Sequence, residues 1–150
     1  MKKQQKGFSL IELLIVVAII LIIAAIAIPN LLRSKMAANE SSAVGSLRTI
    51  NTASVAYSTQ YGQYATNLVN LETNGTVSSS AADLIDTVLG GGSKSGYTFT
   101  YTTANGNTTY SIVAAPISAS TGQSGFYTDQ SGVIRKNTGG TATSASTPIG

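Results

Sequence analysis

The hydrophobic pattern sets the N-terminal part of the chain apart from the rest. Between Phe8 and Ile28 the only polar side chains are those of Ser9 and Glu12. As an α-helix with about 1.5 Å of rise per residue, this segment would span about 31 Å, close to the hydrocarbon core of a bilayer. The pattern therefore predicts a helix that needs lipid, or an equally apolar protein interior, around it.

A second helical pattern follows Pro29. Its apolar residues are spaced by three or four and share one helical face: Leu47, Ile50, Ala53, Tyr57 and Tyr61. The polar residues Ser41, Arg48, Thr52 and Thr59 fall on the opposite face. We predict one helix from Phe8 to about Tyr61, kinked at Pro29 because proline has no N–H to donate. The alternative is that the helix ends at Pro29.

The segment after this helix is predicted to be irregular. Gly62 ends the helix, and residues 63–79 read as a loop with Leu68, Val69 and Leu71 as apolar anchors. Ser80 followed by Asp83 resembles a capping box, which predicts a short amphipathic helix up to Gly90. Asp83 and Asp86 alone offer too few oxygen ligands to predict a cation site. Residues 90–96 lack the spacing of a phosphate-binding loop and are predicted to be a flexible linker.

Alternation of aromatic residues with threonine begins at Tyr97 and predicts a strand. Asn105-Gly106 offers a two-residue hairpin turn. Closing that turn sets three cross-strand pairs: Tyr101 with Tyr110, Phe99 with Ile112, and Tyr97 with Ala114. One face of the hairpin is then apolar and can dock on the stripe of Leu47, Ile50, Ala53 and Tyr57. A second hairpin is predicted from residues 126–128 and 133–135.

The fold class that follows is α+β, a long kinked N-terminal helix packed against a small antiparallel β-sheet head. Residues 137–150 are almost all Gly, Thr, Ser and Ala. This low-complexity tail is predicted to be a disordered end, or alternatively a polar lid over the sheet or a site of O-linked glycan.

Composition narrows the function classes. The chain of 150 residues has room for one modest globular head. It contains no cysteine and no histidine, so disulfides, thiolate and histidine metal sites and a Ser-His-Asp triad are excluded. We therefore expect no catalytic residues, no metal, no cofactor and no specific nucleic acid site, and predict a structural protein.

The excess of positive charge lies at the N-terminus. The formal net charge of +3 equals the contribution of Lys2, Lys3 and Lys6, because the other six basic residues balance six acids. Basic residues ahead of an apolar span favour a cytoplasmic N-terminus. Without these three lysines the side chains sum to zero, so the basic pI carries no information about nucleic acid.

The front of the span carries a basic leader, then Gly7, the aromatic Phe8, and Glu12 four residues beyond Phe8. These residues resemble those of the type IV prepilin family, including the pseudopilins of type II secretion. The resemblance is strongest over residues 6–30 and is recognisable to Tyr64. The chain departs from the family at Ala65, where many relatives have proline.

This resemblance implies a defined fate for the chain. A prepilin peptidase that is also a methyltransferase would cut between Gly7 and Phe8 and methylate the new Phe8 amine. The lollipop-shaped pilin would wait in the inner membrane as a single-pass protein with a cytoplasmic N-terminus. Pilus assembly machinery would then build it into an extracellular homo-oligomeric filament, with Glu12 and Pro29 as assembly residues.

The predicted organisation follows from these elements. Residues 1–7 are the leader that is removed, 8–28 the transmembrane and filament-core helix, and 29–61 its amphipathic continuation. Residues 62–136 form the globular head, with the loop, the short helix and the sheet. Residues 137–150 form the low-complexity tail.

Several alternatives stay open at this point. A secretory signal peptide, cleaved near Ile28, also has a basic start and an apolar run, although its apolar region is normally shorter and free of acids. A plain single-span anchor is another. For function, a major subunit of a type IV pilus, a type II secretion pseudopilin and a membrane-tethered binding module compete.

Overall fold

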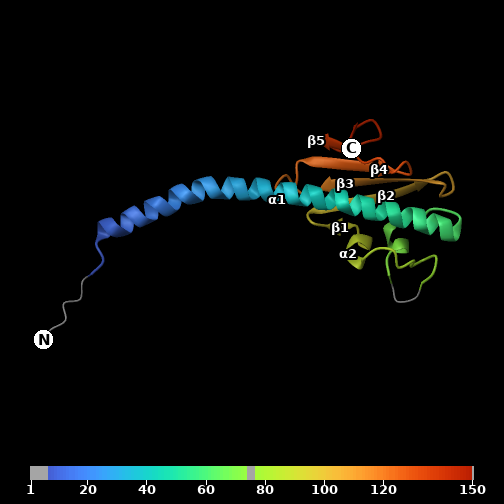
Figure 1. The fold of residues 1–150 in the computed structure, drawn as a ribbon, viewed down its shortest axis with the longest axis horizontal. Coiled ribbons are helices and arrows are strands. Elements are labelled where there is room, and N and C mark those ends of the chain that lie inside the picture. Colours follow the sequence, from blue (N-terminus) through green and yellow to red (C-terminus); the bar gives the residue numbers. More distant parts are fainter. Residues whose placement is uncertain (1–6, 74–76, 150) are drawn as a thin grey trace. The chain divides into compact units, whose positions relative to one another are not determined.

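A computed structural model describes residues 7–73 and 77–149 of the chain. The predicted leader at residues 1–6 lies outside the described residues. The fold divides into two compact units, Met1–Ser34 and Lys35–Gly150. A single long helix, α1 (Leu10–Tyr61), contributes to both (Figure 1).

The first unit consists of the apolar part of α1. The helix begins at Leu10 rather than at the predicted Phe8, because Ser9 and Glu12 cap it there. It continues through Pro29, so the alternative that it ends at this proline is wrong. The large apolar side chains of this unit are exposed, from Phe8 at 82% to Val17 at 44%.

The second unit contains a six-stranded antiparallel sheet in which each strand pairs with the next one along the chain (Figure 1). The strands are β1 (Ser93–Lys94), β2 (Tyr97–Ala104), β3 (Thr109–Pro116), β4 (Ser124–Asp129), β5 (Arg135–Thr138) and β6 (Thr147–Pro148). A 3₁₀ turn, η1 (Leu68–Leu71), and a short helix, α2 (Thr87–Gly90), precede the sheet. The α+β class is confirmed.

The core of this unit forms where the C-terminal half of α1 meets the sheet. Four residues of the predicted stripe are at most 4% exposed: Leu47, Ile50, Ala53 and Tyr57. They share one cluster with Tyr97, Phe99 and Ile112, and Tyr101 packs against its edge. The predicted docking of the hairpin face on the helical stripe is therefore confirmed.

The predicted register of the first hairpin is wrong by two residues. Tyr101 pairs with Ile112 and Phe99 with Ala114. The cause is the turn, because Asn105, Gly106 and Asn107 all have positive φ and Ala104 pairs with Thr109, which leaves a four-residue loop. A shift of two preserves the alternation of faces, so the apolar face still points at α1.

The predicted short helix from Ser80 is also wrong. Only α2 is helical there, and its N-cap is Asp86, whose side chain accepts from the Leu89 N–H at 2.8 Å. Asp83 has a φ of 55° and lies before the helix. The preceding residues bond to η1 and its flanks instead, for example Leu84 N–H to Leu71 O at 2.8 Å.

Three further expectations need correction. The predicted glycine-rich linker contains strand β1, which pairs with the start of β2. Of the three loop anchors, Leu68 and Leu71 are buried but Val69 is 53% exposed. The second predicted hairpin exists as β4 and β5, but Val133 and Ile134 belong to its loop and Tyr127 pairs with Arg135.

The described part of the tail, residues 137–149, is ordered, contrary to the expected disordered end. It contributes the end of β5 and all of β6 to the sheet. Ala142 is 1% exposed, and the Ile149 N–H donates to Ile134 O at 2.9 Å. The tail packs by close backbone contact and not through large side chains. Its backbone at Gly140 lies so close to Gly125 that a Cβ added to Gly125 would be 2.6 Å from Gly140 O.

Candidate assembly site

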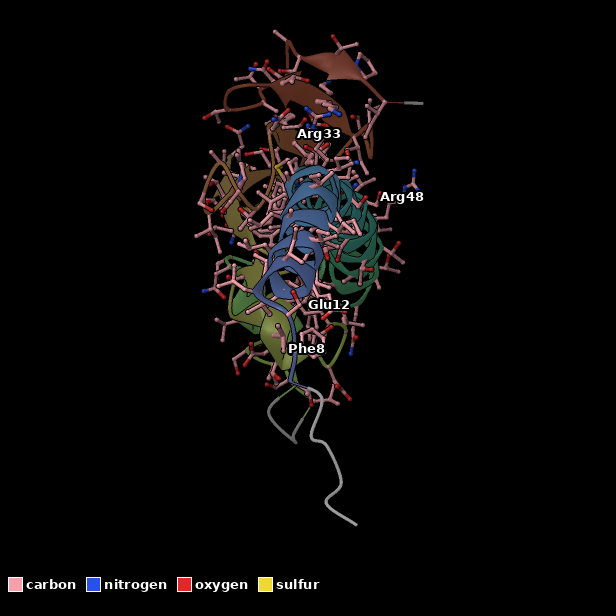
Figure 2. The ribbon with its side chains drawn as sticks, turned by 90° about the vertical axis from the view of Figure 1, so that its left-hand side faces the viewer. Phe8, Glu12, Arg33 and Arg48 are labelled. Atoms are coloured by element: carbon pink, nitrogen blue, oxygen red, sulfur yellow. The ribbon has the colours of Figure 1, made fainter. Side chains whose placement is uncertain are left out.

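The N-terminus of α1 holds the predicted site residues Phe8 and Glu12 (Figure 2). Glu12 is the third residue of the helix, and its Oε2 accepts a hydrogen bond from the Ser9 backbone N–H at 2.9 Å. The first helical hydrogen bond runs from Leu13 N–H to Ser9 O at 3.2 Å. Ser9 and Glu12 thus form the reciprocal half of a capping box, in which an acid satisfies the N–H of the cap residue.

This cap was missed by the sequence reasoning, although its signal is present. The spacing Ser9-x-x-Glu12 just before an apolar run is the signature of a helix start. The cap places an acidic group in the first turn, where the helix macrodipole favours negative charge. In the single chain, the Glu12 carboxylate therefore accepts a hydrogen bond from the Ser9 backbone N–H at the exposed end of an apolar helix.

The surface behind Glu12 is continuous and apolar. Large exposed side chains occupy both sides of the helix from Leu10 to Leu32, and Ala24 alone in this stretch is partly covered. Among the described residues, α1 is the helix long and apolar enough to cross a membrane, and none of its most apolar window is buried. Such an exposed surface requires lipid or other helices around it.

Pro29 lies inside α1, at the end of this surface. Arg33 follows it and is exposed. Gly7, on the other side of Phe8, is exposed and outside the helix, and the space where its Cβ would sit is open to at least 4 Å. The predicted junction between Gly7 and Phe8 therefore lies on accessible, non-helical backbone.

A second cluster ties α1 to the sheet in the second unit. One carboxylate oxygen of Glu40 accepts from the N–H groups of Gln123 and Ser124 at 3.1 and 3.2 Å. The other oxygen pairs with Lys136 Nζ at 3.3 Å. The neighbouring Asn39 Nδ2 donates to Thr121 O at 2.8 Å. These bonds hold the loop before β4 against the helix.

The environment of Glu40 changes its acidity. Partial burial raises the pKa of the carboxyl, but the Gln123 N–H and Lys136 outweigh that effect, so the pKa is lowered. Glu40 is therefore ionised at neutral pH and acts as a fixed acceptor. No local pattern predicts this role, because the partners lie 83 to 96 residues away along the chain.

Two further acids, Asp86 and Asp129, have structural partners. Asp86 pairs with Lys94 at 2.8 Å. Asp129 accepts from the Ser131 N–H and hydroxyl and from the Tyr127 hydroxyl, which completes a turn. In the part of the chain that the structure describes, no group of three or more His, Cys, Asp or Glu residues is placed to hold a metal ion.

Comparison with known proteins adds to this geometry. Residues 2–28 match the model of the prokaryotic N-terminal methylation motif. The chain is 42% identical over 62 residues to the type IV major pilin protein PilA of Myxococcus xanthus. It is 60% identical over 38 residues to the type IV wide pilus major component PilA4 of Thermus thermophilus.

The matched regions cover 41% and 25% of this chain, and 28% and 29% of the relatives' own lengths. The motif spans the leader, the capping residues and most of the exposed apolar surface. The chain therefore carries the N-terminal methylation motif of prokaryotic pilins and is a homologue, over its matched region, of type IV major pilins.

Proposed function

We propose that this chain is the structural subunit of a type IV pilus. The observation that carries the proposal is the surface of α1 from Leu10 to Leu32, which is apolar apart from Glu12 and Asn30 and which the single chain leaves exposed. Before assembly this surface lies in the inner membrane as a single span. In the filament the same surface packs against the helices of other copies, and the heads face the medium.

Processing prepares the subunit for assembly. Prepilin peptidase cuts between Gly7 and Phe8 and methylates the new amine of Phe8. The accessible backbone at Gly7 and the methylation motif over residues 2–28 support this step. We expect the intact mass of protein taken from the cell surface to match a chain that starts at Phe8 with one added methyl group.

A start near Ile28 would instead indicate a cleaved signal peptide. A chain that keeps Met1 would indicate a plain anchor. Either mass contradicts the processing proposal.

Glu12 gains its partner through this cleavage. An ionised acid in an apolar helix costs several kcal/mol, about 2.5 to 3.5 at the centre of a bilayer, so it favours a pairing partner. The ammonium on Phe8 of a neighbouring copy supplies one. A subunit that slipped out of register would leave both charges unpaired in an apolar setting, so the pair also fixes axial position.

Imaging of sheared surface filaments, with mass spectrometry of their subunit, tests the function itself. Filaments composed of this chain support the proposal, and its retention in the membrane without filaments contradicts it. Adhesion, motility and DNA uptake are properties of the whole fibre. The alternative function is a pseudopilin, which shares the N-terminal features but forms a short periplasmic pseudopilus.

A further inference from the structure

The exposed face of α1 in the second unit is built mostly from small side chains. They are Ala37, Ala38, Ser41, Gly45, Thr49, Thr52, Ala56 and Thr59. Between residues 36 and 61, Arg48 is the one exposed position that carries a charge. Its side chain extends away from the helix (Figure 2), and within the described residues its guanidinium has no hydrogen bond or ion pair.

A hollow of about 390 Å³ lies beside Arg48, on the flank of α1 that faces β4 and β5. Val44, Phe126 and Ile149 give it an apolar lining, and Gly45 leaves open space where a Cβ would sit.

The charge around this hollow is not balanced. Lys136 and Glu40 also line it but are paired with each other. Arg48 is therefore an uncompensated cation at the hollow. An occupant with a carboxylate would complement it.

The turn before α2 offers such a carboxylate. Asp83 is exposed and, in the described part of the chain, makes no ion pair, whereas the neighbouring Asp86 is paired with Lys94. The turn is anchored to the rest of the head, because Asp83 N–H donates to Glu72 O at 3.2 Å and the Tyr57 hydroxyl to Ser79 O at 2.7 Å. It therefore presents its acid from a fixed backbone.

The hollow and the turn lie on opposite flanks of α1. Both views place β5 on one side of the C-terminal half of α1 and α2 on the other (Figures 1 and 2). The lining residues agree, since this hollow joins α1 to Phe126 and Lys136, while a second hollow joins α1 to Leu84. Arg48 borders both hollows and so lies between the two flanks. Different patches on opposite flanks make a heterologous contact, which builds open helical assemblies instead of closed dimers.

We propose that the hollow beside Arg48 receives the Asp83 turn of a second copy, with an ion pair from Arg48 to Asp83 between neighbouring heads. The proposal rests on the filament function and specifies how adjacent heads meet around the fibre. The small side chains on the exposed face of α1 let the neighbouring turn approach closely. The pair leaves the Phe8 and Glu12 contact unchanged, since it involves other residues.

The absence of cysteine from the chain allows a direct test by crosslinking. Arg48→Cys and Asp83→Cys are introduced together into the full chain, and sheared filaments are oxidised and run on a non-reducing gel. We expect a ladder of dimers and larger species that collapses on reduction. The matched control is Arg48→Cys with Thr98→Cys, which pairs Arg48 with another exposed position, on β2, and should remain monomeric.

The outcomes separate this contact from the filament function. Filaments that form normally but give only monomers overturn the contact and leave the pilus proposal standing. If the unaltered chain forms no filaments, the pilus proposal fails first. A product that stays monomeric in size but changes mobility on oxidation shows a bond within one chain, which also overturns the contact.

Charge reversal gives a second readout without new bonds. We expect Arg48→Glu and Asp83→Lys each to reduce the yield of filaments, because each places like charges at the contact. The double variant should restore the yield. Two neutral single variants, or a double variant as poor as either single one, contradict the pair. Melting of the full-length Arg48→Glu variant in detergent should match the parent chain, because this side chain is exposed. Asp83→Lys also places a lysine at a φ of 55°, so its filament yield is compared with that of the double variant, which shares this backbone strain.

Discussion

The two units of this chain differ in how far they bury the apolar side chains of α1. In the first unit, large apolar side chains on all sides of α1 are between 44% and 75% exposed. In the second, five apolar residues of the same helix are at most 4% exposed, and its exposed positions are mostly polar or small. The second unit completes its own core, whereas the first leaves its apolar surface for lipid or other copies to cover. Mutations in the two units should therefore fail in different ways.

The largest effect is expected at Glu12. Glu12→Leu keeps the length and apolar character of the helix but removes the partner for the amine of Phe8. We expect insertion into the membrane with little or no filament formation, and an unchanged melting temperature of the head. Counting surface filaments and measuring the monomer in membranes checks this. Glu12→Gln is the closer control for shape, and normal filament numbers from Glu12→Leu would discard the pairing.

Phe99→Ala tests the core of the second unit. The Phe99 side chain is 4% exposed in the shared core of helix and sheet. Its removal should cost about 3 to 5 kcal/mol of unfolding free energy, a large share of the stability of so small a head. Thermal melting of the full chain in detergent measures it. Thr100→Ala, on the exposed face of the same strand, should change stability by at most about 0.5 kcal/mol. Equal melting of the two variants would refute the docking.

Glu40→Gln should have a smaller effect that depends on pH. It weakens two backbone hydrogen bonds and the pair with Lys136, at a cost of about 1 to 3 kcal/mol near neutral pH. Because the folded pKa of Glu40 is lowered below 4.5, its contribution is present above that pH and is lost as the pH falls through the folded value. Melting curves of both proteins should therefore converge in acid. A gap that is constant down to the lowest pH would contradict this role.

Added calcium should have the smallest effect on the melting temperature. An unchanged melting temperature favours the pilus over the pseudopilin. The resemblance to type II secretion pseudopilins implies, for a major pseudopilin, a calcium loop rich in acids near the C-terminus. Here both oxygens of Asp129 bond to neighbouring side chains and backbone. We expect no change in melting temperature with millimolar calcium. A rise of several degrees that Asp129→Ala abolishes would favour the pseudopilin.

The sequence by itself determined the features that repeat along the chain. The spacing of three or four residues from Leu47 to Tyr57 predicted the buried stripe of the helix. The alternation from Tyr97 to Tyr101 predicted the apolar face of the hairpin. The prediction of the hairpin face holds although the predicted register is wrong, because a two-residue shift in register leaves the faces of each strand unchanged. The helix start was also encoded locally, in the spacing of Ser9 and Glu12.

Only the tertiary structure decided features that depend on distant contacts. The role of Glu40 required Gln123 and Ser124, which lie 83 and 84 positions further along the chain, to meet the helix. Strand β6 exists because β5 offers an edge to residues that have no strand pattern of their own. The hairpin register followed from three consecutive positive φ angles that the Asn-Gly signal did not specify. Local patterns record which face of an element is apolar, whereas backbone pairing and charge partners depend on which segments the fold brings together.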